Sequence, residues 1–139
     1  MSNIYTAMAA IQKEFPAVPK EGINPSMKYK FRGIDDAMKA LNPLLSKHGV
    51  FIVPQEFDVT LSDGGSTGGG KNQIRAVLRG KVRWYAADGT YIESAIIGEG
   101  IDTGDKAVMK CQANAMKYLI YYTFTVPTEE KRDSESFAD

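Results

Sequence analysis

The sequence has only one cysteine, Cys111, and one histidine, His48. This scarcity excludes a disulfide framework and a structural zinc site, because each needs several such residues. The chain also lacks a signal-peptide pattern and an apolar run long enough to span a bilayer, so we expect a cytoplasmic protein without membrane contact. Its formal net charge is zero, which makes overall charge a poor guide to partners. With 139 residues, 43% of them hydrophobic, the chain is long enough for one domain with a real core.

Charge is nevertheless unevenly distributed. Residues 128–139 contain five acidic and two basic side chains, so this segment carries −3 and residues 1–127 carry +3. The segment is also short and polar, which is typical of a chain end that does not pack. We therefore predict one domain over residues 1–127 and a flexible acidic tail over residues 128–139.

Two amphipathic helices are predicted in the first half of the chain. Apolar residues recur at helical spacing from Ser2 to Phe15 and again from about Ile34 to His48. Gly49 is suited to end the second helix. Pro43 predicts a kink or a break after Leu41, because proline removes a backbone donor inside the helix.

The segment between these helices is predicted to be a loop followed by a basic strand. Residues 16–26 contain three prolines and a glycine, which favours a loop. Met27–Arg32 then alternates in polarity, so that Lys28, Lys30 and Arg32 face one way. Such a face suits nucleic acid, although alternating lysines also protect edge strands from unwanted pairing.

A second strand is predicted from Val50 to Leu61, followed by a glycine-rich loop over residues 62–72. The residues expected to share one face of this strand are Phe51, Val53, Phe57 and Val59. The loop lacks the Gly-Lys-Ser/Thr sequence of nucleotide-hydrolase loops, so we predict a long hairpin tip instead.

Gln73–Tyr85 carries the clearest strand pattern, with a period of two along its whole length. One face is predicted to hold Arg75, Val77, Arg79, Lys81, Arg83 and Tyr85. A three-residue turn with Gly89 in the left-handed region leads into a strand over Thr90–Ile97. This turn sets Tyr85 opposite Tyr91 and Arg83 opposite Glu93, which are favourable cross-strand pairs.

Acidic residues on the neighbouring strands offer a different explanation of this basic face. Glu56, Asp58 and Glu93 are placed to pair with its cations. Three acids do not cancel the positive charge of this face if Met27–Arg32 adds three further cations. We therefore expect the face to be net positive and to carry aromatic residues among the cations. That composition suits a single strand, because cations follow phosphates and rings stack on bases.

The last helix is predicted from about Lys106 to Tyr121, with Asp105 as its N-cap. Its apolar residues cover more than half of its circumference, so we expect it to be mostly buried. The remaining polar stripe consists of Lys106, Lys110, Asn114, Lys117 and Tyr121. This stripe suits an anionic polymer, although three lysines also simply keep one helix face solvated. A short final strand is expected from Tyr122, Phe124 and Val126.

Two other functions compete with nucleic-acid binding. Glu99, Asp102 and Asp105 are closely spaced carboxylates of the kind that hold Mg²⁺ in a nuclease. Against this, Asp105 already has a role as a helix cap, and the nearby glycines, Gly98 included, are expected to turn the backbone from sheet to helix. The third function is an oligomerisation or protein-interaction module, whose basic face meets an acidic partner surface or the acidic tail.

Two stretches resemble the Erf family of phage single-strand annealing proteins, where Erf stands for essential recombination function. They are YKFRGIDDAMKALNPLLSKHGV (Tyr29–Val50) and GEGIDTGDKAVMKCQANAMKYLIYYTFTVPTEE (Gly98–Glu130). The resemblance implies ATP-independent binding of single-stranded DNA and annealing of complementary strands during homologous recombination, in the cytoplasm of a bacterial host cell. It also implies rings or helical arrays of subunits, with a host single-strand-binding protein or a phage exonuclease as further partners. Members commonly carry a further C-terminal region, so we expect this chain to be naturally short or truncated.

The fold class that the resemblance implies is α+β. The expected core is an antiparallel hairpin sheet with a long helix packed across it, in β-β-β-α order, as in the eukaryotic annealing protein of double-strand-break repair, with helices added at the N-terminus. DNA is expected in a positive groove between the sheet and a lower helical layer. The candidate DNA-binding residues are Lys28, Lys30, Arg32, Arg75, Arg79, Lys81, Arg83, Lys106, Lys110 and Lys117. The candidate stacking residues are Tyr29, Tyr85 and Tyr121, and no catalytic residue, metal or cofactor is expected.

Overall fold

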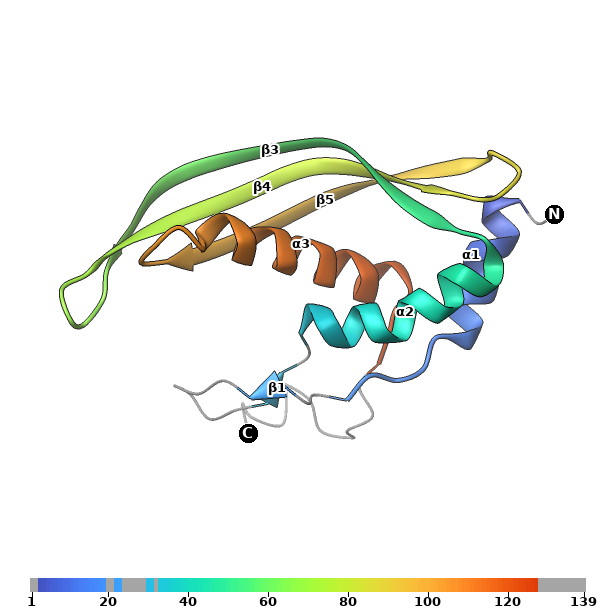
Figure 1. The fold of residues 1–139 in the computed structure, drawn as a ribbon, viewed down its shortest axis with the longest axis horizontal. Helices are drawn as coiled ribbons and strands as arrows, with labels where there is room; N and C mark the ends of the chain where they lie inside the picture. Colours follow the sequence, from blue (N-terminus) through green and yellow to red (C-terminus); the bar gives the residue numbers. More distant parts are fainter. Residues whose placement is uncertain (1–2, 20–21, 24–29, 32, 128–139) are drawn as a thin grey trace.

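The computed structural model describes residues 3–19, 22–23, 30–31 and 33–127. It is an α+β fold in which three long antiparallel strands form a sheet and the helices lie on one side of it (Figure 1). The long last helix, α3 (Ala107–Thr123), packs against the sheet. The predicted β-β-β-α core is therefore confirmed, with helices preceding it.

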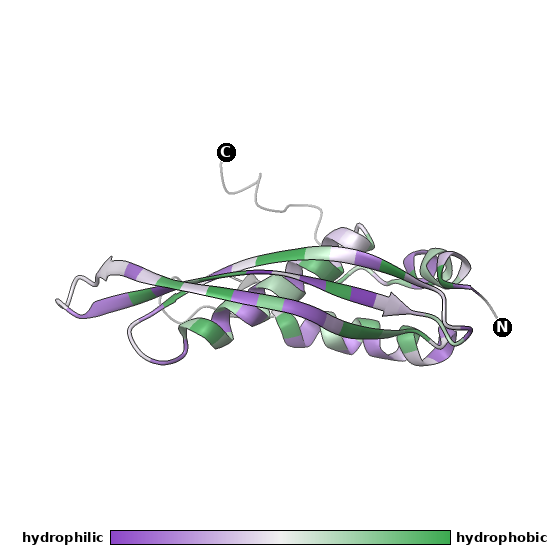
Figure 2. Cartoon of the chain, turned by 90° about the horizontal axis from the view of Figure 1, so that it is seen from above, coloured by the Kyte–Doolittle hydropathy of each residue, from purple (hydrophilic) through white to green (hydrophobic). Residues whose placement is uncertain are grey.

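The sheet has the strand order β3 (Phe51–Ser66), β4 (Asn72–Tyr85) and β5 (Tyr91–Asp102). Tyr85 pairs with Tyr91, as the predicted three-residue turn requires, and Gly89 has a φ of 89°. Polar and apolar residues alternate along the strands (Figure 2). The buried residues of β4, which are Ala76, Leu78, Val82 and Trp84, all lie on one face, because only that face is covered by helices.

The β3–β4 hairpin is longer than expected and contains a bulge. β3 continues to Ser66, so the connection spans only residues 67–71 rather than 62–72. The pairing shifts between Pro54 and Glu56. An extra residue inverts the side-chain alternation beyond it. The prediction that Phe51, Val53, Phe57 and Val59 share a face is therefore wrong. Phe51 and Val53 share their face with Glu56 and Asp58, and this is also the face of β4 that carries the cations.

Helix α3 begins and ends differently from the prediction. Its N-cap residue is Lys106 and makes no side-chain capping bond, so Asp105 is not the cap. The helix continues to Thr123 and ends at Phe124, and the expected strand over residues 122–126 does not form. Phe124 is 3% exposed and packs edge-on against Trp84, with ring centroids 5.4 Å apart. Burial of this ring draws the chain into the core rather than along the sheet.

Two glycines of β5 let α3 approach the strand closely. Gly98 and Gly100 lie within β5, not in the turn that we predicted. A Cβ atom at Gly98 would stand 2.6 Å from the backbone oxygen of Cys111, and one at Gly100 would stand 2.6 Å from the backbone nitrogen of Cys111. Real Cβ atoms do not approach so closely, so side chains here would push the helix away from the sheet.

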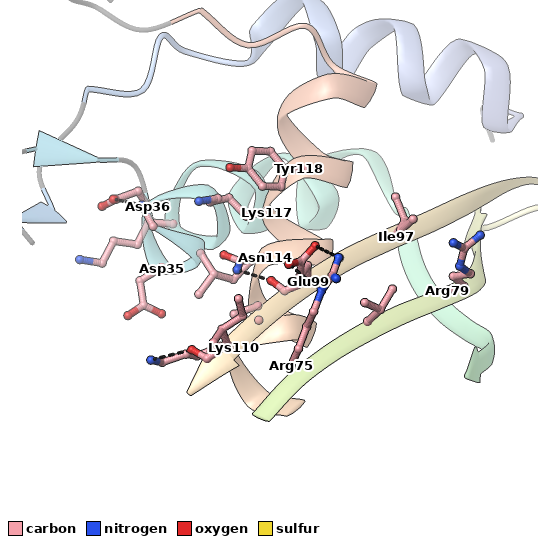
Figure 3. Close-up of a pocket in the computed structure, with 18 residues that line it drawn as sticks. Asp35, Asp36, Arg75, Arg79, Ile97, Glu99, Lys110, Asn114, Lys117 and Tyr118 are labelled. Atoms are coloured by element: carbon pink, nitrogen blue, oxygen red, sulfur yellow. Dashed lines mark hydrogen bonds and ion pairs between the residues drawn. The ribbon is translucent and has the colours of Figure 1, made fainter. Parts of the chain in front are cut away.

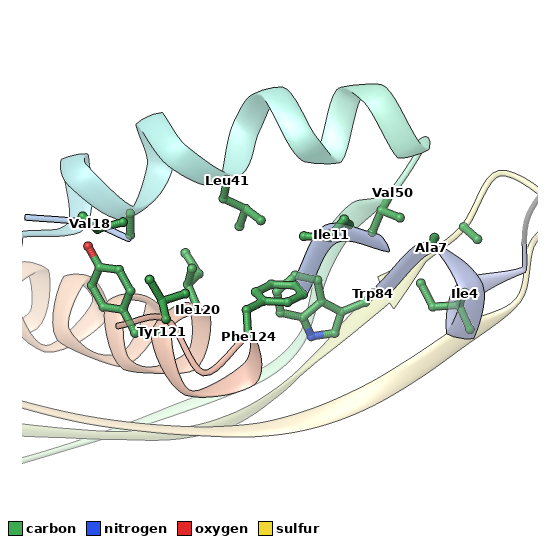
Figure 4. Close-up of a cluster of buried hydrophobic side chains, with 13 residues drawn as sticks. Ile4, Ala7, Ile11, Val18, Leu41, Val50, Trp84, Ile120, Tyr121 and Phe124 are labelled. Atoms are coloured by element: carbon green, nitrogen blue, oxygen red, sulfur yellow. The ribbon is translucent and has the colours of Figure 1, made fainter. Parts of the chain in front are cut away.

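Helices α1 (Ile4–Glu14) and α2 (Ile34–His48) complete the core next to the last turns of α3 (Figure 4). Gly49 ends α2 in the left-handed conformation, as predicted. The helix does not break at Pro43, contrary to one of the two expected outcomes. Leu41 on one side of the proline is buried and Leu44 on the other packs against the same core, so burial on both sides offsets the lost backbone hydrogen bond.

Only part of the predicted strand Met27–Arg32 falls among the described residues. Lys30 and Phe31 form β2 (Lys30–Phe31), which pairs with β1 (Gly22–Ile23) in a separate two-stranded sheet. The expectation that this segment extends the basic face of the main sheet is therefore wrong for Lys30. Lys28, Tyr29 and Arg32 lie outside the described residues.

No helix within the described ranges combines the length and the apolar character needed to cross a lipid bilayer.

Candidate nucleic-acid interface

A groove of about 1340 Å³ follows the outer edge of β5, where α3 and the start of α2 approach the strand (Figure 3). Residues from both faces of β5 line it, from Ile97 to Ile101, so the groove runs along the strand edge. The charged residues of its lining are Asp35, Asp36, Lys39, Arg75, Arg79, Glu99, Lys110 and Lys117. Five are basic and three are acidic, which leaves the groove with a net charge of +2 from these side chains.

The floor of the groove is held in place by contacts between α3 and β5. The Asn114 side-chain amide donates a hydrogen bond to the backbone oxygen of Glu99 at 2.8 Å. This residue belongs to the polar stripe predicted on the helix, and it is one helical turn from Lys110. The close approach at Gly98 and Gly100 therefore brings the lysines of α3 next to the arginines of β4, which belong to a different layer of the fold.

Two groove cations are already paired with carboxylates. Arg75 makes a two-pronged contact with Glu99, at 2.9 Å and 3.0 Å. Lys110 binds Asp102 at 3.0 Å, and its hydrogen bond is the main reason that the pKa of Asp102 is lowered. The donors in these pairs fit a phosphate as well as a carboxylate, because guanidinium and ammonium groups donate to both anions.

Tyr118 and Tyr122 are the aromatic residues that α3 exposes. The sequence pattern did not single out Tyr118, and it assigned Tyr122 to a final strand rather than to an exposed helix face. Tyr118 lines the groove and is 46% exposed, and its ring stacks on Tyr122 with centroids 5.7 Å apart. The Lys117 ammonium lies 4.6 Å from the centre of the Tyr118 ring. Their spacing of four residues on a helix was the available signal, because such residues share a face.

The prediction that Tyr121 stacks on bases is wrong, because its side chain is 4% exposed and belongs to the hydrophobic core (Figure 4). One helical position separates it from Tyr122, which points to the opposite environment. The rotation of α3 against the sheet decides which of the two rings is buried, and the polar stripe in the sequence does not specify that rotation.

The predicted cations divide into separate groups. Arg75, Arg79, Lys110 and Lys117 meet in the groove. Lys81 and Arg83 lie farther along β4 and both contact Glu93, at 3.9 Å and 3.1 Å. Lys106 is exposed but does not line the groove. Lys39 lines it and was not predicted.

The open face of the main sheet is not net positive, contrary to the prediction. Its basic residues are Arg75, Arg79, Lys81 and Arg83, and its acidic residues are Glu56, Asp58, Glu93 and Glu99. The strand register places these eight side chains on one face, so their charges cancel. The edge groove is net positive because Lys39 of α2 and Lys110 and Lys117 of α3 join Arg75 and Arg79 there.

The carboxylates of the nuclease alternative do not form one site. Glu99 is paired with Arg75 and Asp102 with Lys110. The described part of the chain contains no cluster of three or more acidic, histidine or cysteine residues arranged to hold a metal ion.

A comparison with protein families matches residues 4–138 to the family described as the ERF superfamily. The match covers nearly the whole chain. A comparison with curated proteins found no match.

Proposed function

Because the chain belongs to the ERF superfamily, a family of the phage recombination context, we propose that it binds single-stranded DNA and anneals complementary strands without ATP. The observation that carries this proposal is the edge groove. It gathers five basic side chains from β4, α2 and α3 beside one exposed aromatic ring, Tyr118. Cations that follow a backbone and a ring that accepts a base are the two features of single-strand binding sites.

The groove suggests how a first strand is held. Arg79 and Lys39 offer cations along its walls, while Arg75 and Lys110 exchange their carboxylate partners for phosphates. Held by its backbone, the strand keeps the Watson–Crick edges of its bases available to a second strand. Base pairing then supplies the free energy for annealing, so the mechanism needs no nucleotide hydrolysis and no catalytic residue.

The proposal extends to assembly and partners. A single groove on a domain of this size holds a short stretch of DNA, so subunits joined in a ring or a helical array would present a continuous path. Such homo-oligomers would act in the cytoplasm of the bacterial host cell, where a host single-strand-binding protein or a phage exonuclease would supply or expose the strands.

The test is an annealing assay with two complementary fluorescent oligonucleotides, in EDTA and without ATP. Annealing faster than the protein-free control, with oligonucleotides of unchanged length, is the expected result. If the annealing rate is unchanged while single-strand binding is intact, the protein binds single-stranded DNA but does not anneal it. Oligonucleotide shortening when EDTA is replaced by Mg²⁺ would instead favour the nuclease alternative.

A further inference from the structure

Three aromatic rings lie together on the open face of the sheet, near the β4–β5 turn and away from the groove. Tyr85 of β4 stacks on Phe51 of β3, with ring centroids 5.6 Å apart and planes inclined by 17°. It also contacts Tyr91 of β5, at 5.2 Å and 44°. Phe51 is 54% exposed and Tyr91 is 45% exposed, so both outer rings are accessible. We call these three residues the aromatic row.

Arg83 holds two rings of the aromatic row, Tyr85 and Tyr91, in position. Its guanidinium donates a hydrogen bond to the Tyr85 hydroxyl at 3.2 Å and lies 4.3 Å from the centre of the Tyr91 ring. It also donates to Glu93 at 3.1 Å. The hydrogen bond to Tyr85 is the largest cause, and that to Glu93 the second, of a raised pKa of Arg83, so the guanidinium stays charged. Rings that are already ordered lose little conformational entropy when they bind a partner.

This part of the surface offers rings rather than net charge. Lys81 and Arg83 both contact Glu93, and Glu56 is paired with Lys81 in the strand register. Exposed aromatic residues bind bases through stacking. Stacking neutralises no phosphate, so it adds little to the salt dependence of binding. The core on the opposite face of the sheet is built from other residues, Trp84 among them, so the aromatic row is not needed to close it.

The aromatic row and the groove are connected by one face of β4. Arg75 and Arg79 line the groove, and Tyr85 lies on the same face six residues beyond Arg79, which is roughly 20 Å at about 3.3 Å per residue. Among the described elements, the helices lie on the other side of the sheet and leave this face uncovered (Figure 1). A single strand leaving the groove along β4 therefore meets the rings.

We propose that the aromatic row is a base-stacking subsite for single-stranded nucleic acid, separate from the phosphate-binding groove. A base stacked by its face keeps its pairing edge open, which is compatible with annealing. The inference rests on the proposed function, because it needs a bound single strand. It adds that part of the affinity comes from bases and is insensitive to salt.

The test compares Phe51→Leu and Tyr91→Leu with the wild-type chain and with Tyr5→Leu, which removes a 70% exposed ring from α1. Binding is measured with an oligonucleotide and with its abasic counterpart at several salt concentrations. Each row variant should bind the normal oligonucleotide at least about five-fold more weakly, with an unchanged salt slope. The abasic strand should show little difference between wild type and variant, and Tyr5→Leu should bind like wild type.

Equal binding by wild type and row variants, while groove variants weaken binding, would overturn the inference and leave the proposed function intact. No binding of any strand by the wild-type chain would overturn both. A change in sedimentation coefficient without DNA, with unchanged affinity per subunit, would assign the row to subunit contacts instead. Thermal unfolding checks that the variants fold. If they do not, photocrosslinking of wild-type protein to 5-bromouracil oligonucleotides should map to Phe51, Tyr85 or Tyr91, and crosslinks confined to Tyr118 and Tyr122 would refute the proposal.

Discussion

Gly98 of β5 lies directly beneath Ala115 of α3, so closely that a Cβ atom at position 98 would stand 2.6 Å from the Ala115 Cβ. Backbone atoms of the helix are equally near, since the Ala115 nitrogen would be at 2.7 Å. The contact sets the distance between the helix and the strand edge, and thereby the position of Lys110 and Lys117 relative to the arginines of β4.

The first prediction follows from this contact. Gly98→Ala should lower the free energy of unfolding by about 1–3 kcal/mol, because overpacking forces the backbones apart. Denaturant unfolding measures the change. The matched control is Gly68→Ala in the hairpin tip, where an added Cβ meets nothing within 4 Å. Equal stability of both variants would show that α3 does not rest on β5 as described.

The second prediction concerns the lysines of the groove. Lys39→Ala and Lys110→Ala should each weaken single-strand binding for all sequences alike and reduce the slope of log K against log salt by about 0.7–1 unit. Lys13→Ala is the control, because Lys13 is an exposed lysine at the end of α1 and does not line the groove. A slope that falls equally in the control would mean that the groove is not the phosphate path.

The third prediction concerns the carboxylate that competes with phosphate. Glu99→Gln should release Arg75 and strengthen single-strand binding by up to about five-fold, since exposed ion pairs contribute about 0.2–1 kcal/mol. Stability should change little for the same reason. Asp63→Asn changes the net charge equally on the same sheet but outside the groove and on the other face from the aromatic row, so it should leave affinity nearly unchanged. Titration of a labelled oligonucleotide compares the two, and weaker binding by Glu99→Gln would contradict the exchange of partners.

The fourth prediction separates two neighbouring tyrosines. Tyr118→Ala should weaken single-strand binding by at least about five-fold, because alanine removes a stacking ring, and should leave the fold intact. Tyr121→Ala should lower the free energy of unfolding by about 3–5 kcal/mol, because it empties a buried site. Binding titrations and denaturant unfolding of both variants make the comparison. The reverse pattern would restore the predicted stacking role of Tyr121.

The fifth prediction concerns the junction of α1 and α2. Glu14 contacts Lys47 and His48, and hydrogen bonds from Lys47 first and His48 second hold its pKa below the ordinary value of 4.5. A lowered pKa in the folded state adds stability above the unfolded-state pKa, and this stability is lost as the pH falls through the folded-state pKa. Wild type should therefore have the higher Tm near pH 7, and its advantage over Glu14→Gln should shrink below pH 4.5. A difference in Tm that is constant across this range would exclude the ionised contact.

Features that depend on neighbouring residues were predictable from the sequence. The turn before Tyr91 required a left-handed glycine, and this requirement set the register of the β4–β5 hairpin. The alternation along Gln73–Tyr85 correctly placed the buried side chains from Ala76 to Trp84 on one face, because that face of the sheet is covered, although Ile74 on the same face is 40% exposed. The bulge after Pro54 was missed, although a proline inside a strand is an available signal for a bulge or an edge strand, because proline has no backbone N–H for the ladder. Its exact position is decided by pairing with β4.

By itself, the sequence determined the three helices, the three long strands, the register of the β4–β5 hairpin and the residue types available for binding. These features depend on backbone propensity, turn chemistry and period, which act over a few residues. Only the tertiary structure decided where charge and rings accumulate. Pairing added Glu99 to the three acidic residues already expected among the sheet cations and so balanced their charge, while the glycine contact with α3 set Lys110 and Lys117 beside Arg75. The rotation of α3 against the sheet buried Tyr121 and exposed Tyr118. These outcomes depend on packing between residues far apart in the chain, and the local pattern does not specify that packing.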